Sequence, residues 1–340
     1  MRLAHIRERH APAGSPWRLA AALDDPPLHL VDLEIARRRA VARRPERAHD
    51  ALLFRQPITT LDDHLARGLR VATLADLIDE FVPSGGPDED EAVLEADEVA
   101  FGPPVVAPLS MRDGYGFEQH VGMMWRRRGG EIPEAWFRLA IFYFSNMSEL
   151  RGPEEPVWAP TGSEELDFEI EIAALIDTRA RDLPPGRAEE AIGGYTIFND
   201  WSARDLQRDE STVRLGPHKG KDFASSIGPW LVTPDELEDA RKGNGFDLTM
   251  TVAVNGTETS RGNWSDIVHG FGSLISRASS DVTVRPGELL GSGTVGTGCL
   301  LEVREQTLGR YLEPGDEVVL RIDHLGTLRT PIVTHPEVRR

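Results

Sequence analysis

The sequence predicts a mainly β protein with α+β elements, organised as a small N-terminal α+β domain over residues 1–104 and a β-rich domain over 105–340. A short acidic stretch rich in proline and glycine, 83–98, separates two regions of different texture and is expected to be a linker or mobile loop. Helical spacing is frequent before it, and short apolar runs with turn signals dominate after it. A length of 340 residues also exceeds the usual size of a single core.

The N-terminal region (residues 1–104) carries one short apolar run and several helical patterns. The expected elements are a strand over 28–33 and helices over 35–44, 61–67 and 73–81, the last with Thr73 as its cap. Arginines at 37–39 and 43–44 are expected to form a solvated helix face rather than a docking patch. Residues 100–108 lead out of this region as an entry strand broken by two prolines.

The C-terminal region (residues 105–340) is dominated by β patterns. Strands are expected over 137–144, 194–198, 248–254, 300–303, 317–322 and 328–333. Asn255-Gly256, between an apolar run and a polar one, is a strong hairpin signal. One helix is expected over 265–278, with Asn263 or Ser265 as its cap.

Composition narrows the range of partners. With 38 basic and 56 acidic residues the net charge is −18, which argues against nucleic acid because phosphate binding needs a basic surface. The single cysteine, Cys299, excludes an internal disulfide and any cysteine-rich zinc site, and its apolar surroundings predict a packed core residue. No apolar run is long enough to predict a signal peptide or a membrane span, so a cytoplasmic location with no membrane partner is the expectation.

The stretch 166–171 (LDFEIE) alternates apolar and acidic side chains. As a strand it would project Asp167, Glu169 and Glu171 from one face, with successive carboxylates about 7 Å apart. Like charges this close repel, so the acidic face lies in water as a solvated edge or holds a cation. The stretch alone leaves both readings open.

Four acidic side chains are the candidate metal ligands: Asp113, Glu169, Glu171 and Asp200. Oxygen donors without thiolates or a histidine pair suit a hard cation, Mg²⁺ first and Mn²⁺ or Ca²⁺ as alternatives, rather than zinc. The sequence contains no EF-hand loop, which disfavours a purely structural calcium module.

Several sequence words around these acids occur in one order. They are DGYGFEQH (113–120), LDFEIE (166–171), NDWSARDLQ (199–207), GPHKGKDF (216–223), GSGT (291–294) and GCLLE (298–302). Together they resemble the fumarylacetoacetate hydrolase family over about 105–335, whereas the N-terminal region shows no such resemblance. The resemblance implies a catalytic domain with a mixed β-roll or β-sandwich core, and a homodimer.

The resemblance also implies roles for individual residues. The four acids would be the ligands of the family's divalent metal. His120, seven residues after Asp113, would be the general base, and Glu302 would orient it; imidazole, with an ordinary pKa of about 6.5, can take a proton from water at neutral pH. The implied groups around the substrate's carbonyl and carboxylate are Lys221, Arg204, Gln207 and Thr294, and Ser225 would support the metal through water. A purely structural role for Arg204, paired with Asp200 or Asp205, stays open.

A weaker correspondence concerns the residues after His120. Allowing for three missing residues, Arg126 and Tyr143 align with the carboxylate-binding arginine and tyrosine of the fumarylacetoacetases. Arg127 or Arg128 could equally be the arginine that faces the substrate.

The activity implied by the resemblance is metal-dependent hydrolysis of a carbon–carbon bond in a β-diketo acid or acylpyruvate, a small keto acid substrate. Two alternatives are kept. One is decarboxylation or isomerisation of a keto acid on the same scaffold, because one fold supports several reactions. The other is a catalytically idle protein that binds a metal and a carboxylate.

Overall fold

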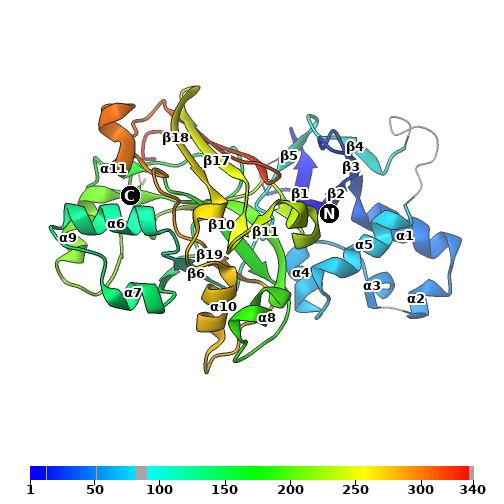
Figure 1. Cartoon of the computed structure of the whole chain (residues 1–340). Helices are drawn as coiled ribbons and strands as arrows, with labels where there is room; N and C mark the ends of the chain where they lie inside the picture. The colour runs from blue at the N-terminus through cyan, green and yellow to red at the C-terminus, as the bar shows by residue number, and fades with distance from the viewer. Residues whose placement is uncertain (13, 51, 82–89, 337–340) are drawn as a thin grey trace.

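The computed structural model describes residues 1–12, 14–50, 52–81 and 90–336 (Figure 1). Within them, 13 strands form one large sheet. Its main row runs β4 (Val93–Glu95), β3 (His29–Asp32), β2 (Arg18–Ala22), β1 (Arg2–Glu8), β14 (Leu231–Val232), β11 (Ile192–Asp200), β10 (Ile170–Ile176), β19 (Glu288–Gly291), β6 (Ser110–Gly114) and β7 (Phe142–Ser145). Off this row, β5 (Val99–Phe101) pairs with β1, and β13 (Ser225–Ile227) pairs with β11 and β8 (Leu150–Arg151).

A second, antiparallel sheet has the order β18 (Thr257–Asn263), β17 (Thr249–Val254), β20 (Glu317–Ile322) and β21 (Gly326–Pro331). Two further strand pairs join β12 (Ser202–Ala203) to β9 (Leu166–Asp167) and β15 (Arg241–Lys242) to β16 (Gly245–Phe246). The predominance of strands confirms the predicted mainly β class with α+β elements.

The helices are short. In the N-terminal region they are α1 (Leu33–Arg43), α2 (Arg47–Asp50), α3 (Leu52–Arg55), α4 (Leu61–Ala66), η1 (Val71–Leu74) and α5 (Ala75–Asp79). Those that follow are α6 (Glu118–Arg127), α7 (Glu134–Arg138), α8 (Pro185–Ala188), η3 (Glu189–Ala191), α9 (Arg204–Ser211), η4 (Pro234–Ala240), η5 (Trp264–Asp266), α10 (Phe271–Ser279), α11 (Leu300–Val303) and η6 (Arg304–Gln306). In the part of the chain that the structure covers, no helix has the length and apolar character needed to cross a membrane.

The N-terminal region is joined to the rest through the large sheet. β1 pairs with β14, with Leu3 opposite Leu231, so the N-terminal strands continue the sheet at one end (Figure 1). Helices α6, α7, α9 and α11 gather at the other end. The division into domains at residue 104 stays a prediction. Of the expected linker 83–98, residues 83–89 lie outside the described residues, and 93–95 form β4.

The two faces of the large sheet bury different cores. Along β10, Ile170, Ile172 and Ala174 belong to a cluster that includes the small sheet, whereas Ala173 and Leu175 pack with the N-terminal helices. This alternation is the period of two that a strand imposes. Glu171 therefore lies on the same face as Ala173 and Leu175, two residues before Ala173.

Much of the predicted secondary structure is confirmed. Strands form at β3, β11, β17, β20 and β21, and helices at α1 and α4, within a few residues of the expected bounds. The hairpin between β17 and β18 turns at Asn255 and Gly256, whose φ angles of 51° and 79° are those that its two-residue turn requires.

Two predicted strands are wrong. The run 137–144 starts inside helix α7, and only its last residues enter β7, where Phe144 is 66% exposed rather than buried. The run 300–303 forms helix α11, because the carboxylate of Asp167 accepts hydrogen bonds from the backbone N–H groups of Leu300 and Leu301. An apolar tetrapeptide carries too little periodicity to distinguish these states.

Two predicted helix starts are also wrong. Thr73 lies inside η1, and its hydroxyl donates to the carbonyl of Arg70 instead of capping α5. The helix expected from 265 begins only at Phe271, with Gly270 before it, while Asn263 caps the short η5 through the N–H of Ser265.

Candidate active site

Three of the predicted metal ligands meet on one face of the large sheet. Asp113, Glu171 and Asp200 come from β6, β10 and β11, and each lies two residues from an apolar side chain that its strand buries on that face: Met111, Ala173 and Phe198. Carboxylate oxygens of all three lie within 4.8 Å of one another. On each strand, the face that is apolar in its buried part therefore ends in a carboxylate.

A glycine makes room for this cluster. Gly291 of β19 pairs with Asp113 on one side and with Ala173 on the other, so it lies between the acidic strands. A Cβ atom at this position would overlap Oδ1 of Asp113 and would approach Oε2 of Glu171 to 3.3 Å. The absence of a side chain at residue 291 is therefore a steric requirement of the cluster.

Four carboxylate oxygens of the cluster lack hydrogen-bond donors. Among the residues described, no donor reaches Oδ1 of Asp113, either carboxylate oxygen of Glu171, or Oδ1 of Asp200, and all three side chains are buried. Burial, reinforced by the neighbouring carboxylates, raises the pKa values of Asp113 and Glu171 well above the ordinary range. Buried carboxylate oxygens without donors are the ligands that a hard divalent cation takes, so the residues present fit such an ion.

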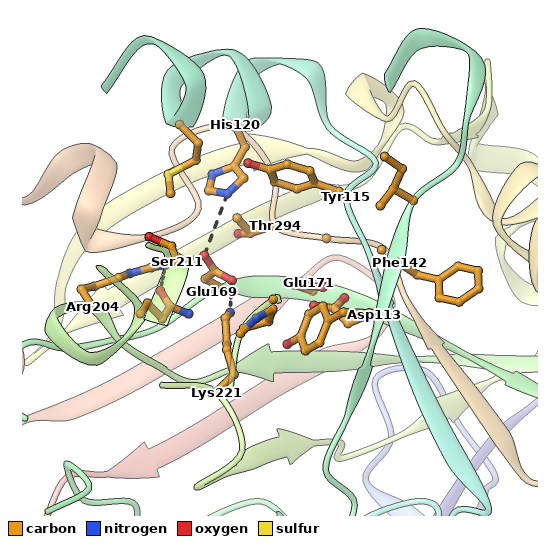
Figure 2. Close-up of a pocket in the computed structure, with 18 of the residues that line it drawn as sticks. Asp113, Tyr115, His120, Phe142, Glu169, Glu171, Arg204, Ser211, Lys221 and Thr294 are labelled. Carbon is orange, nitrogen blue, oxygen red and sulfur yellow. Dashed lines mark hydrogen bonds and ion pairs between the residues drawn. The ribbon is translucent and has the colours of Figure 1, made fainter. Parts of the chain in front are cut away.

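Glu169, the fourth predicted ligand, lies apart from this group. Its carboxylate accepts hydrogen bonds from Lys221 and, at 2.8 Å, from Nη2 of Arg204 (Figure 2). Burial alone would raise the pKa of Glu169, but the positive charges of Lys221 and Arg204 outweigh burial and hold it below the ordinary range. Residues 168–169 interrupt the predicted strand between β9 and β10, so Glu169 and Glu171 do not share one regular strand face. Its assignment as a ligand stays a prediction.

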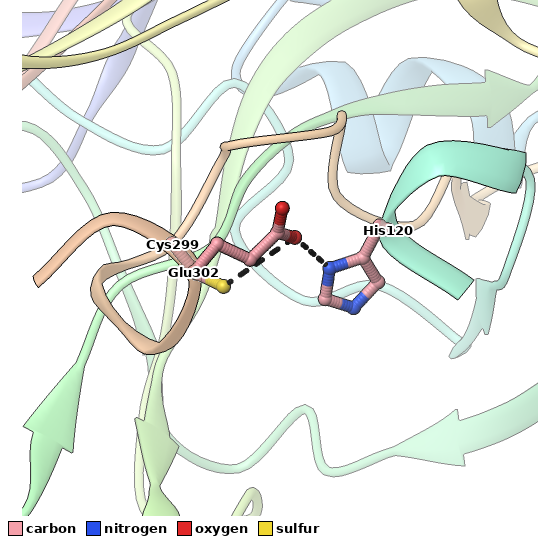
Figure 3. Close-up of side chains that lie close together, drawn as sticks. All are labelled: His120, Cys299 and Glu302. Atoms are coloured by element: carbon pink, nitrogen blue, oxygen red, sulfur yellow. Dashed lines mark hydrogen bonds and ion pairs between the residues drawn. The ribbon is translucent and has the colours of Figure 1, made fainter. Parts of the chain in front are cut away.

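His120 and Glu302 form a hydrogen-bonded pair (Figure 3). His120 lies on α6 and Glu302 on α11, 182 residues apart in sequence. Because a carboxylate accepts, we assign the imidazole proton to Nδ1, which leaves the lone pair on Nε2. Glu302 is held in turn by the N–H of Thr297 at 2.8 Å, and the buried thiol of Cys299 lies 3.8 Å from its Oε1. The predicted packed character of Cys299 is confirmed.

The free nitrogen of His120 faces the acidic side of the site. Nε2 lies 3.9 Å from Oε1 of Glu169, as the dashed line in Figure 2 marks. This distance is too long for a direct hydrogen bond and leaves room for a bridging water.

These groups line one pocket of about 430 Å³. Its lining includes Asp113, His120, Glu169, Glu171, Arg204, Gln207, Lys221, Thr294 and Tyr143. Arg204 does not pair with Asp200 or Asp205, as the structural alternative had it, but with Asp167 and Glu169. Ser225 of β13 lies opposite Asp200 of β11 in the register of these two paired strands, and its role beside the metal stays a prediction.

The structure separates the three candidate arginines. Arg128 lines the pocket, whereas Arg126 does not, and Nη1 of Arg126 lies over Gly122. Arg127 donates to the carbonyl of Leu301 and to the sulfur of Met123. Of the three, Arg128 is the one placed to meet a substrate.

Two predicted substrate ligands are engaged within the protein. The Tyr143 hydroxyl donates to Oδ2 of Asp200 at 2.7 Å, and the Thr294 hydroxyl donates to the carbonyl of Ile170 at 2.9 Å. A substrate carboxylate would have to replace these acceptors. The roles of both residues toward substrate stay predictions.

Sequence reasoning missed other pocket residues: Tyr115, Ser211 and Arg214. Tyr115 lies within the word 113–120 and packs edge-on against the ring of His120. Its position two residues after Asp113, just past the end of β6, was the available signal. Ser211 ends α9 and Arg214 follows it, in a polar segment with no comparable signal.

Residues 110–333 match the family model described as fumarylacetoacetate (FAA) hydrolase, C-terminal. The chain belongs to this family. A 2,4-didehydro-3-deoxy-L-rhamnonate hydrolase from Sphingomonas sp. (strain SKA58) is 34% identical over 195 residues, which are 56% of this chain and 64% of that protein. The chain thus spans less than two thirds of this relative.

Solved structures confirm the fold. The fumarylacetoacetate hydrolase of Exiguobacterium antarcticum superposes with a TM-score of 0.68 at 21% identity, covering 98% of this chain and 100% of that one. The 2-hydroxyhepta-2,4-diene-1,7-dioate isomerase of Mycobacterium marinum gives 0.62 at 21% identity, covering 99% and 100%. Proteins with this fold therefore include ones named as hydrolases and as isomerases, and the family match supports the expected hydrolase class at the level of the family.

Proposed function

We propose that this protein is a metal-dependent hydrolase that cleaves a carbon–carbon bond in an acylpyruvate or related β-diketo acid. The observation that carries the proposal is the His120–Glu302 pair, whose Nε2 opens into the pocket that Asp113 and Glu171 line, where Oδ1 of Asp113 and both carboxylate oxygens of Glu171 are buried without donors. A base held by a carboxylate is the arrangement that activates water, and a donor-free acidic cluster is the arrangement that takes a hard cation.

In the proposed reaction, Nε2 of His120 removes a proton from a water molecule that bridges it to Glu169. The water oxygen forms a bond to the acyl carbon of the substrate. The bond between that carbon and the methylene group then breaks, and its electron pair stays on the methylene carbon as an enolate. The proton on Nε2 passes to this carbon, so that one water and one substrate give a carboxylic acid and a pyruvate-type acid.

Donors around the pocket suit the negative charge that develops on the acyl oxygen. The Lys221 ammonium group has three N–H donors and gives two of them to Glu169 and Asp200. Gln207 accepts from Arg204 through Oε1, so its amide N–H groups remain to donate. Donors fixed in a dry pocket stabilise an oxyanion more than donors in water do.

Asp113, Glu171 and Asp200 would hold the cation, with Glu169 beside them. When bound there, a divalent ion supplies Lewis-acid polarisation of the keto oxygens of the substrate. Their all-oxygen chemistry favours Mg²⁺, with Mn²⁺ and Ca²⁺ as alternatives.

The test is a screen of acylpyruvates and β-diketo acids with Mg²⁺ or Mn²⁺ in isotopically labelled water. We expect one labelled oxygen in the carboxylic acid product. Turnover that leaves the carbon skeleton intact and incorporates no label would support isomerisation instead, and loss of carbon dioxide would support decarboxylation. No turnover of any member of the panel would favour the idle binding protein.

We propose that the protein acts as a homodimer on a small keto acid and has neither nucleic acid nor a membrane as a partner. The net charge of −18 supports the absence of a nucleic-acid partner, and the family resemblance supports the homodimer. Light scattering coupled to gel filtration tests the dimer.

A further inference from the structure

Asp167 has no role in the reaction proposed above, yet it is completely buried and fully hydrogen-bonded. Its Oδ2 accepts from Nε of Arg204 at 2.7 Å and from the N–H of Leu301 at 3.0 Å. Its Oδ1 accepts from the N–H of Leu300 at 2.7 Å. One carboxylate thus contacts two elements, α9 and α11, that lie far apart in the sequence.

Each of these elements carries one half of the candidate catalytic machinery. On one side, Arg204 bridges Asp167 and Glu169, because its Nε donates to Asp167 and its Nη2 donates to Glu169 at 2.8 Å. On the other side, the turn that Asp167 holds at Leu300 and Leu301 presents Glu302, which orients His120.

The contacts close into a ring. It runs from Asp167 through Arg204 to Glu169, across the 3.9 Å gap to His120, and back through Glu302 and α11. Every step is a hydrogen bond or a chain segment except the gap, which is where the proposed water lies. The width of that gap therefore depends on Asp167.

We infer that Asp167 is a positioning residue that fixes the His120–Glu302 pair against Glu169 and so sets the site of the attacking water. This inference rests on the proposed function. Near-attack geometry decides rate, and a displacement of about 1 Å can cost on the order of 100-fold in turnover. Asp167 itself neither lines the pocket nor belongs to the acidic cluster, so it acts through the residues it holds, Arg204 and the start of α11.

The variant Asp167→Asn can keep only one of the two connections that Asp167 makes, to α9 or to α11. An amide has one acceptor oxygen, so it can serve the N–H of Leu300 or the guanidinium of Arg204, and its NH₂ group faces a donor at the other position. We expect kcat to fall about 10- to 100-fold, while KM and the affinity for Mg²⁺, measured by calorimetry, change by less than about threefold because no ligand or pocket group is removed.

Asp177→Asn is the matched control. Asp177 is also buried, and its carboxylate also accepts from an arginine, Arg70, and from a backbone N–H, that of Val71, but outside the pocket. We expect both variants to lose comparable stability, and only Asp167→Asn to lose kcat. Equal loss of kcat in the two variants would overturn the inference.

A second test asks whether Asp167 acts through Glu302. In a Glu302→Ala background, Asp167→Asn should lower the residual kcat by less than about twofold, because the Glu302 carboxylate that Asp167 positions is already absent. If the two losses multiply, the inference is wrong. Should the asparagine variant fail to fold, Asp167→Ser, which is smaller and admits water, takes its place in the same comparisons.

A spectroscopic readout does not depend on the substrate. The proton on Nδ1 of His120 is shared with a carboxylate, and such protons resonate far downfield in proton NMR spectra. We expect this resonance to shift or broaden in Asp167→Asn and to stay unchanged in Asp177→Asn. An unchanged resonance in Asp167→Asn would contradict the positioning role even if the proposed substrates are not turned over.

Discussion

The acidic cluster and the buried histidines of the N-terminal region meet the same physical problem in different ways. His5 is completely buried, and both of its ring nitrogens have partners: Nε2 accepts from the N–H of Leu61 at 3.0 Å, so Nδ1 carries a proton and donates to the carbonyl of Pro103 at 2.8 Å. Burial lowers the pKa of His5, and the neutral ring satisfies both neighbours. In the cluster, by contrast, burial leaves Oδ1 of Asp113 and both carboxylate oxygens of Glu171 without donors.

The difference separates a structural site from a functional one. A buried group that serves the fold has partners for its polar atoms, as the neutral ring of His5 does. Carboxylates buried together without donors destabilise the protein that holds them, and they persist where a ligand completes them. Substitutions in the candidate active site and matched substitutions at structural buried residues therefore test this contrast.

The largest expected effect is that of His120→Ala on turnover. Loss of a general base lowers kcat by about 10²- to 10⁴-fold, whereas Mg²⁺ affinity measured by calorimetry should stay within about twofold, because His120 is not part of the acidic cluster. His5→Gln is the control: its amide can accept from Leu61 and donate to Pro103, so it should keep kcat. Retained turnover in His120→Ala would refute the base.

The next effect concerns Mg²⁺ and stability. For the wild type, Mg²⁺ at 100 times its Kd should raise the free energy of unfolding by about 2.7 kcal/mol, and the chelator EDTA should reverse this. In Glu171→Gln the Mg²⁺ effect should vanish, while the metal-free protein gains stability on the order of 1 kcal/mol because one repelling charge is gone. Urea denaturation with and without Mg²⁺ measures both.

Glu288→Gln provides the contrast for that experiment. Glu288 is as buried as Glu171 but pairs with Arg112, so neutralising it should lower stability and leave the Mg²⁺ effect intact. A Glu171→Gln variant that behaves like Glu288→Gln would remove the distinction between the two kinds of buried carboxylate.

The smallest effect is the response of the N-terminal region to pH. Burial holds the pKa values of His5 and His64 below the ordinary value of about 6.5, so the unfolded chain binds more protons below that pH. Stability from these rings is present above about pH 6.5 and is lost as the pH falls from there, by at most about 1.4 kcal/mol per pH unit for each ring.

Urea titrations at several pH values, in saturating Mg²⁺, measure this response. Mg²⁺ is kept saturating because the pKa values of Asp113 and Glu171 are raised in the metal-free protein. Without the metal, these carboxylates would lower the free energy of unfolding as the pH rises, which is opposite to the effect of the histidines. His5→Gln cannot titrate and should flatten the profile. A profile as steep as that of the wild type would show that His5 does not contribute.

Local signals predicted a large part of this protein. Alternation and turn chemistry gave β11, β17 and the hairpin at Asn255-Gly256, because both signals act over a few neighbouring residues. Elements whose conformation depends on a distant partner were missed. Helix α11 is the clearest, since its first N–H groups bond to Asp167, which lies 133 residues earlier.

For the site, the sequence by itself determined the kinds of residue and their order: the carboxylates, the histidine with its acidic partner, and the family to which they belong. Only the tertiary structure decided which of them meet. It grouped Asp113 and Glu171 across Gly291, turned Glu169 toward Lys221, and chose Arg128 over its neighbours. Strand order, register and a break of two residues set these distances, and none of the three is written in the spacing of residues along one chain.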